Sequence, residues 1–257
     1  GAAGVTVGRN IRLQTGNSGV ATIGALNASG TSIFSGNVTL GTNSAAAKPL
    51  TIFSTAGGTL AFNGNLLRAT SATGITDALT LNGGGTVIFR GTNTYTGSTT
   101  VNGGTLLLDH SANNGDKISA TAPLTLAGGS LSLAGNSAAP TAVAVSELIL
   151  GNSALPTGGG GRILVTSGLD QNATLTVNGI TRYSGATMDF STVNTGTGIA
   201  SIVTSTPNTS TGILGAFATS NRSDWASNDG SGIIIPLAAG SYGTTFASGA
   251  HTSLSAN

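Results

Sequence analysis

The chain has 257 residues, of which 41 are Gly, 39% are hydrophobic and only 7% are charged. This hydrophobic share allows a buried core and argues against disorder. With nine basic and eight acidic residues the net charge is +1, so the chain lacks the basic surface that nucleic acid or an anionic membrane would require. The chain has no Cys, so no disulfide stabilises it.

No segment is apolar for long enough to insert into a membrane. The most apolar stretch, residues 233–237, is interrupted by Pro236 and is far shorter than the roughly 20 residues of a membrane helix. The sequence starts at Gly1 without the pattern of a signal peptide. We therefore expect that any signal peptide has been removed or lies outside this sequence.

Two short strand patterns recur along the chain, separated by Gly-rich turns. The pattern Leu-Thr-apolar occurs at residues 50–52, 79–81, 124–126 and 175–177. The pattern Gly-Gly-Thr/Ser-apolar-x-apolar occurs at residues 57–62, 84–89, 103–108 and 128–133. Because apolar residues alternate in both, each predicts a strand that buries every second side chain.

The spacing of these strands predicts an all-β fold of the solenoid type. Intervals of about 20 to 27 residues fit one coil of a β-helix better than a sandwich, because extra residues can bulge from a turn without disturbing the ladder. We predict a right-handed single-stranded parallel β-helix of roughly ten coils. One domain covers residues 1–257: residues 1–179 form the repeat coils, and residues 180–257 form a thicker, aromatic-rich end region.

One stretch has a longer pattern. Residues 83–106 read GGGTVIFRGTNTYTGSTTVNGGTL, which resembles the autotransporter-associated β-strand repeat, also called the passenger-associated transport repeat. Residues 185–190, 212–219 and 224–226 resemble segments that accompany these repeats in large bacterial surface proteins. The resemblance implies a β-helical passenger that is secreted, extracellular or on the cell surface. It implies no common ligand and no catalytic residues.

The densest group of polar side chains lies in residues 109–116, and its members are Asp109, His110, Asn113, Asn114 and Asp116. A calcium loop that starts at Asp109 would need Gly at position 114 and Glu at position 120, but Asn114 and Ala120 stand there. We predict a solvated turn and no metal site.

An enzyme is a remote alternative. Some β-helix proteins degrade polysaccharides with paired carboxylates, and stacked coils could bring Asp77 and Asp109 together. The carboxylates are otherwise isolated in the sequence, and no nucleophile or phosphate motif occurs. We predict that the chain is not an enzyme, with no catalytic residues and no cofactor.

Trp225 is the only Trp and follows Asp224. An exposed Trp beside a carboxylate suits stacking on a sugar ring, and Tyr183 is a second candidate for such a contact. The alternative is that Trp225 closes one end of the core. Trp225, Asp224 and Tyr183 are the candidate glycan contacts.

Neither end of the chain has the sequence of a cap, so we expect the ends to be covered by flanking repeats or by other copies of the chain. Stacking of copies head to tail through the solenoid ends would produce a filament. The predicted function is a non-catalytic extracellular structural protein, either a stalk or a self-assembling filament or surface-layer subunit. The alternative is a monomeric adhesin or glycan-binding module with a surface polysaccharide as its partner.

Overall fold

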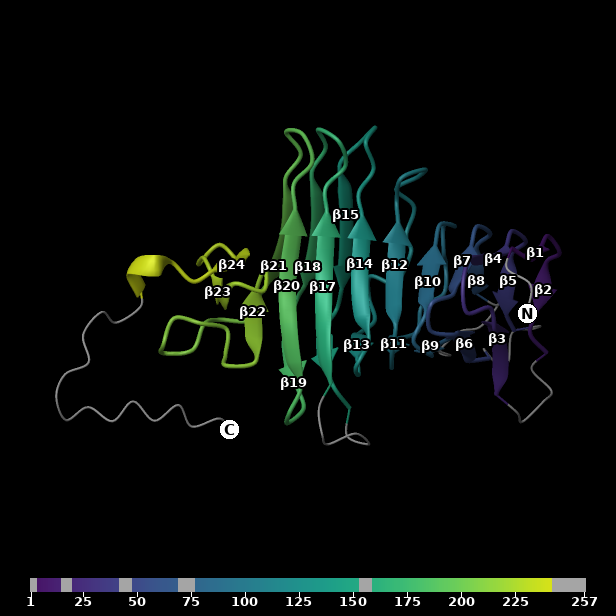
Figure 1. Ribbon diagram of the computed structural model, residues 1–257, viewed down its shortest axis with the longest axis horizontal. Helices are drawn as coiled ribbons and strands as arrows, with labels where there is room; N and C mark the ends of the chain where they lie inside the picture. Colours follow the sequence, from purple (N-terminus) through teal and green to yellow (C-terminus); the bar gives the residue numbers. More distant parts are fainter. Residues whose placement is uncertain (1–3, 15–19, 42–47, 69–76, 153–158, 242–257) are drawn as a thin grey trace.

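The computed structural model describes residues 4–14, 20–41, 48–68, 77–152 and 159–241, and almost all of its regular structure is β. The exception within these ranges is one short 3-10 helix, η1 (Ala239–Ser241). The strands stack in register along one axis as a β-solenoid (Figure 1). The prediction of an all-β parallel solenoid is confirmed.

The longest ladder of strands, here called the long sheet, extends along the whole molecule. Its parallel strands are β1 (Thr6–Val7), β4 (Thr31–Phe34), β7 (Thr59–Phe62), β10 (Thr86–Phe89), β12 (Thr105–Asp109), β14 (Ser130–Ala134), β17 (Gly160–Thr166), β20 (Thr187–Val193) and β22 (Ala218–Ser220). In Figure 1 the chain rises through this sheet, returns behind it and advances from the purple end to the yellow end, which makes the coil right-handed.

Three further ladders complete the coils. The seven-stranded sheet contains β3 (Ala21–Ala25), β6 (Leu50–Ser54), β9 (Leu79–Asn82), β11 (Thr99–Val101), β13 (Leu124–Leu126), β16 (Leu148–Leu150) and β19 (Ile180–Arg182). The two short sheets contain β2 (Ile11–Arg12), β5 (Val38–Leu40) and β8 (Leu66–Arg68), and β15 (Thr141–Val145), β18 (Ala173–Val177) and β21 (Ala200–Thr204).

The coils are fewer and longer than predicted. The solenoid makes about seven turns rather than roughly ten. The long sheet pairs Thr86 with Thr105 but Leu131 with Ile163, so the number of residues in a coil varies widely. Some coils hold more residues than the sequence pattern indicated, because loops extend from the turns between strands that stay in register.

The C-terminal end of the solenoid is closed by antiparallel strands. After β22 the chain reverses into β23 (Asp224–Asn228) and then β24 (Ile234–Pro236), both antiparallel to their neighbours. These strands help to bury Ala226 and Ile234 against the core. The sequence did not predict these antiparallel strands; residues 248–257, on which the prediction of an uncapped C-terminal end rested, lie outside the described residues.

The core is a set of columns of apolar side chains, one from each coil. At the ends of β4, β7 and β10 the rings of Phe34 and Phe62 stack with centroids 5.4 Å apart, and Phe89 meets Phe62 edge-on at 5.8 Å. Leu108 and Leu133 continue this column in the next two coils. The alternation of apolar residues predicted from the sequence thus becomes a continuous core.

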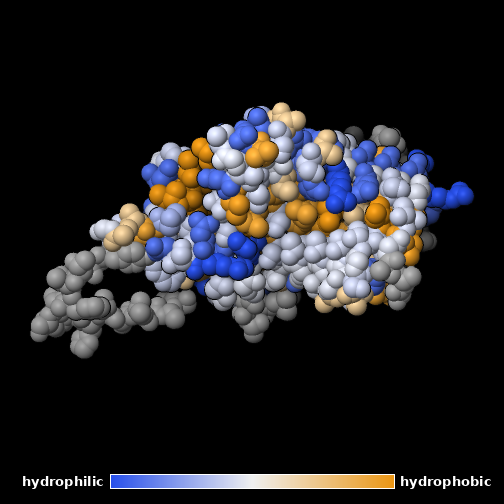
Figure 2. Space-filling view, turned by 45° about the horizontal axis from the view of Figure 1, so that its top comes forward, coloured by the Kyte–Doolittle hydropathy of each residue, from blue (hydrophilic) through white to orange (hydrophobic). Residues whose placement is uncertain are grey.

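The outer surface is built largely from uncharged polar columns. On the seven-stranded sheet one register column consists of Thr22, Thr51, Thr80, Thr100, Thr125, Ile149 and Thr181. Most of the face in Figure 2 is pale, with separate blue and orange patches. A chain with 7% charged residues is therefore covered by hydroxyl groups rather than by ion pairs.

The Gly-Asn pairs form the corners that follow the long sheet. The backbone N–H of Asn65 donates to Asn37 Oδ1 at 2.9 Å, and the N–H of Thr92 donates to Asn65 Oδ1 at 2.8 Å. Gly64 packs so closely on the coil below that a Cβ would lie 2.2 Å from the carbonyl oxygen of Gly36. Glycine is therefore required at this corner for space.

We expect Gly64→Ala to lower the free energy of unfolding by about 1–3 kcal/mol, because the backbones of two coils must separate. Gly179→Ala is the matched control, since a Cβ there meets nothing within 4 Å. Urea unfolding followed by circular dichroism measures both. Equal stability of the two variants would show that the corner does not pack as described.

Candidate functional site

The long sheet carries a row of outward-facing side chains whose chemistry changes toward the C-terminal end. In register order the row contains Thr59, Thr86, Thr105, Ser130, Arg162, Asp189, Thr219 and Trp225. Hydroxyl groups occupy the early coils, and the last coils carry two charged residues and an aromatic one. The change marks the C-terminal part of this face as the candidate site.

Asp189 on β20 is the centre of the charged part. Its carboxylate lies 3.4 Å from Arg162 Nε and 3.9 Å from Arg222 Nε. It also accepts hydrogen bonds from the hydroxyl groups of Ser191 and Thr219 and from the backbone N–H of Arg222, at 2.7 Å in the last case. Since its side chain is only 11% exposed, Asp189 organises its neighbours rather than facing solvent.

Arg222 is presented by a tight hairpin turn between β22 and β23. The backbone N–H of Ser223 donates to the carbonyl oxygen of Ser220 at 3.2 Å. Asn221 and Arg222 have φ values of 51° and 58°, the left-handed conformation that a type I′ hairpin turn needs at both central positions. The turn leaves the Arg222 side chain 69% exposed.

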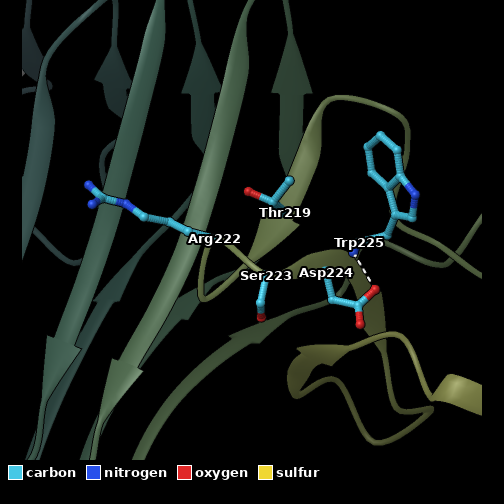
Figure 3. A pocket seen from close by; sticks show the side chains of 5 residues that line it. All are labelled: Thr219, Arg222, Ser223, Asp224 and Trp225. Carbon is cyan, nitrogen blue, oxygen red and sulfur yellow. Dashed lines mark hydrogen bonds between the residues drawn. The ribbon is translucent and has the colours of Figure 1, made fainter.

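Three open hollows lie side by side on this face. One of about 260 Å³ is lined by Thr219, Arg222, Ser223, Asp224 and Trp225 (Figure 3). A second of about 350 Å³ shares Thr219 and Trp225 with it, and a third of about 190 Å³ shares Arg222. The three hollows share lining residues, with Arg222 standing between the first and the third, and together they are here called the outer groove.

Trp225 lies on the outer face and does not close the core. Along β23 the side chain of Ala226 points into the core and is fully buried, whereas the side chain of its neighbour Trp225 points outward. Trp225 is 37% exposed. Asp224 lines the same hollow, and its carboxylate accepts the backbone N–H of Trp225 at 2.9 Å. Tyr183 is 41% exposed in the turn after β19, but it lines none of the three hollows.

The sequence patterns did not single out Arg162, Asp189, Thr219 or Arg222. Arg162 and Asp189 are as far apart in sequence as Thr59 and Thr86, and both pairs are register neighbours. The spacing of the repeat was therefore a usable signal. It was hidden because the Gly-Gly-Thr pattern is absent from the later coils.

The polar group at residues 109–116 is partly buried, so the prediction of a solvated turn is wrong for Asp109 and His110. The carboxylate of Asp109 accepts a hydrogen bond from Arg90 Nε at 2.8 Å. It also accepts hydrogen bonds from the backbone N–H and the hydroxyl group of Ser111. Burial alone would raise the pKa of Asp109, but Ser111 and Arg90 outweigh it and hold this pKa below its usual range. Among the described residues no three His, Cys, Asp or Glu side chains gather as metal ligands.

Burial of His110, with repulsion from Lys117, lowers the pKa of its imidazole to about 4, and Asp109 opposes this only in part. In the unfolded chain the pKa of this His is near 6.5. Between pH 4 and pH 6.5 the unfolded chain therefore binds more protons than the folded chain does. We therefore expect the stability to fall by up to about 3 kcal/mol as the pH drops from about 6.5 to about 4.

The variant His110→Gln removes this titration. Chemical unfolding of both proteins at pH 7, 6, 5 and 4 measures the difference. The free energy of unfolding of the parent chain should fall more steeply than that of the variant across this range. Parallel pH profiles would show that His110 is protonated as readily in the folded chain as in the unfolded one.

Asp77 and Asp109 do not form a carboxylate pair. Asp77 is fully buried just before β9, where one oxygen accepts the backbone N–H groups of Thr96 and Gly97 at 2.7 and 3.2 Å. Asp109 ends β12 in the long sheet. The example pair considered for polysaccharide cleavage is thus absent, and both carboxylates hold turns in place.

These features define a parallel β-solenoid with one grooved face. The passenger-associated-transport-repeat model matches residues 79–108. The chain therefore contains the repeat that its sequence resembled, in strands β9 to β12. This family is a structural passenger repeat and not an enzyme family.

Searches of curated proteins and of solved structures gave no match. In the described ranges no helix has the length and apolar character needed to cross a membrane.

Proposed function

We propose that the chain is a non-catalytic structural segment of a secreted or cell-surface protein, a β-solenoid stalk onto which further coils stack. The observation that carries this proposal is the difference between the two ends of the described solenoid. The transport repeat supports the location, since repeats of this kind belong to secreted passengers.

The N-terminal end is open. Among the described strands, β1, β2 and β3 are the outermost of their sheets, so no described strand pairs with one edge of each. A hollow of about 250 Å³ at this end is lined by apolar residues that include Val7 and Phe34. Val5 is 52% exposed and Leu26 is 75% exposed. An apolar end with unpaired strand edges suits a further β coil.

At the C-terminal end, antiparallel strands follow the last parallel coil. The strand β24 is antiparallel to β23 and ends in Pro236, which donates no hydrogen bond to a further strand. Head-to-tail stacking of identical copies would need both ends to accept a coil. The stalk is favoured over the head-to-tail filament, because the antiparallel, Pro-containing β24 is a poorer edge for a further parallel coil than β1, although β19 also ends its sheet here.

A structural role also agrees with how the carboxylates are used. Asp77, Asp109 and Asp189 each accept several hydrogen bonds from their own or an adjacent coil. A general acid or base must face its substrate, whereas these side chains hold the backbone of adjacent coils.

Sedimentation velocity of the purified chain tests the stacking end. We expect a concentration-dependent dimer formed through the open N-terminal ends, since two such ends can cover each other in a closed contact. Leu26→Lys should abolish the dimer by placing a charge on the apolar rim. Leu169→Lys is the matched control, because Leu169 is 55% exposed on a turn between β17 and β18 and should leave the dimer intact.

A monomer at all concentrations would contradict the proposal that the N-terminal end is a stacking end. Equal loss of the dimer in both variants would also contradict it, because the contact would then not depend on the N-terminal rim.

A further inference from the structure

The outer groove has the shape of a site for an extended chain. It reaches from Thr105 on β12 to Trp225 on β23 and crosses six adjacent strands. At the usual strand spacing this is a length of about 24 Å. Each of the three hollows is open to solvent, so a row of them suits a linear polymer better than a small molecule that must be enclosed.

Trp225 provides an aromatic surface at one end of the groove. Its partly exposed indole stands apart from the other side chains that line the hollow (Figure 3). An exposed Trp on a surface made mostly of small polar residues leaves apolar area in water, and a sugar ring can cover that area by stacking.

Hydroxyl groups occur in all three hollows, beside apolar side chains such as Phe217 and Leu164. Thr105, Ser130 and Ser132 belong to the hollow farthest from Trp225, and Thr219 lies between Arg222 and Trp225. Hydroxyl groups both donate and accept hydrogen bonds, as the hydroxyl groups of sugars do. The carboxylate of Asp224, at the Trp225 end, adds an acceptor.

One charged side chain of the groove, Arg222, is placed to recognise a charged sugar. Arg162 and the hydrogen bonds from Thr219 and Ser191 already satisfy Asp189. Arg222 approaches Asp189 only at 3.9 Å and is mostly exposed, so its guanidinium keeps donors for a ligand.

From this geometry we infer that the outer groove binds a linear acidic polysaccharide built from hexuronate sugars. The guanidinium of Arg222 pairs with a sugar carboxylate, for which its planar donors are well shaped. Trp225 stacks on a neighbouring ring, and the hydroxyl rows bind the ring hydroxyl groups. This inference goes beyond the stalk function and does not depend on how the coils stack.

Affinity electrophoresis and calorimetry with polygalacturonate and alginate test the inference. We expect the parent chain to bind at least one of these polymers. Fully methyl-esterified polygalacturonate keeps the same sugars without the charge, and its affinity should be lower by about tenfold, the effect of losing one charged hydrogen-bonded pair. Equal binding of the esterified polymer would overturn the acidic specificity, and no binding of either uronate polymer would overturn the site.

Matched variants locate the contact. Trp225→Ala and Arg222→Gln should each weaken uronate binding by about tenfold or more. Tyr183→Ala and Arg12→Gln change an exposed aromatic and an exposed Arg outside the groove and should bind as the parent does. Thermal unfolding of each variant verifies folding. If Tyr183→Ala lost binding while Trp225→Ala kept it, the groove would not be the site.

The same measurements separate this inference from the proposed function. Leu26→Lys should lose the dimer and keep full uronate binding, because Leu26 lies at the open end, on the turn after β3. Loss of binding in Leu26→Lys would place the polymer at the N-terminal end and overturn the groove.

Discussion

Phe62→Ala is expected to lower the free energy of unfolding by about 3–5 kcal/mol. Phe62 is one of the largest fully buried side chains, and its ring contacts the rings of both Phe34 and Phe89. Truncation therefore opens a cavity across three coils that rigid strand pairing prevents from closing. Urea unfolding at pH 7 measures the change.

The control for this prediction is Phe53→Ala. Phe53 belongs to β6 but faces outward and is only partly buried, so we expect a loss of about 1 kcal/mol. Equal losses for Phe53→Ala and Phe62→Ala would mean that the stacked phenylalanine column does not stabilise the core more than surface packing does.

Lys117→Met is expected to lower the free energy of unfolding by about 3 kcal/mol or more. Lys117 is 1% exposed, and its ammonium donates to the carbonyl oxygens of Arg90 and Asn113 and to Asn113 Oδ1, at 3.0, 3.3 and 2.7 Å. Burial lowers the pKa of Lys117, which Asp109 and Asp116 oppose. Met fills the space but leaves these acceptors without their donor.

Asn113→Ala is the companion variant for Lys117. It removes one acceptor and keeps the ammonium and two of its carbonyl partners, so the loss should be smaller, about 1 kcal/mol. Urea unfolding of both variants gives the comparison. A Lys117→Met protein as stable as the parent would show that the hydrogen bonds of Lys117 contribute no net stability.

The strands were predictable because their signal is local. The alternation in residues 57–62 and 84–89 fixes which side chains face inward, and these segments became β7 and β10. The alternation of apolar residues does not indicate which sheet of the solenoid a strand joins. Residues 175–177 share the Leu-Thr pattern of residues 50–52, yet they lie in a short sheet rather than in the seven-stranded one.

The antiparallel end and the burial of His110 were not predictable in the same way. The type I′ turn at Asn221 and Arg222 contains no Gly, the residue that most often marks such a turn. His110 and Lys117 are buried because neighbouring coils cover them, a contact between residues more than 20 positions apart. Polar composition alone suggested a solvated turn.

The candidate site depends on the same long-range contacts. Trp225 and Asp224 could be found from their residue types, but Arg162 and Asp189, which complete the row, come from other coils. Which residues meet on the long sheet depends on the length of every coil between them, and those lengths vary. The sequence therefore indicated the aromatic end of the groove and missed its charged centre.

Negative-stain electron microscopy of the purified chain is the most direct test of the stalk proposal. Nine parallel strands in the long sheet correspond to a rod of roughly 4 nm. We expect single rods at low concentration and pairs of rods joined at one end at high concentration, with single rods alone for Leu26→Lys. Long unbranched fibres of the parent chain would contradict the account, because they would require the closed C-terminal end to accept another coil.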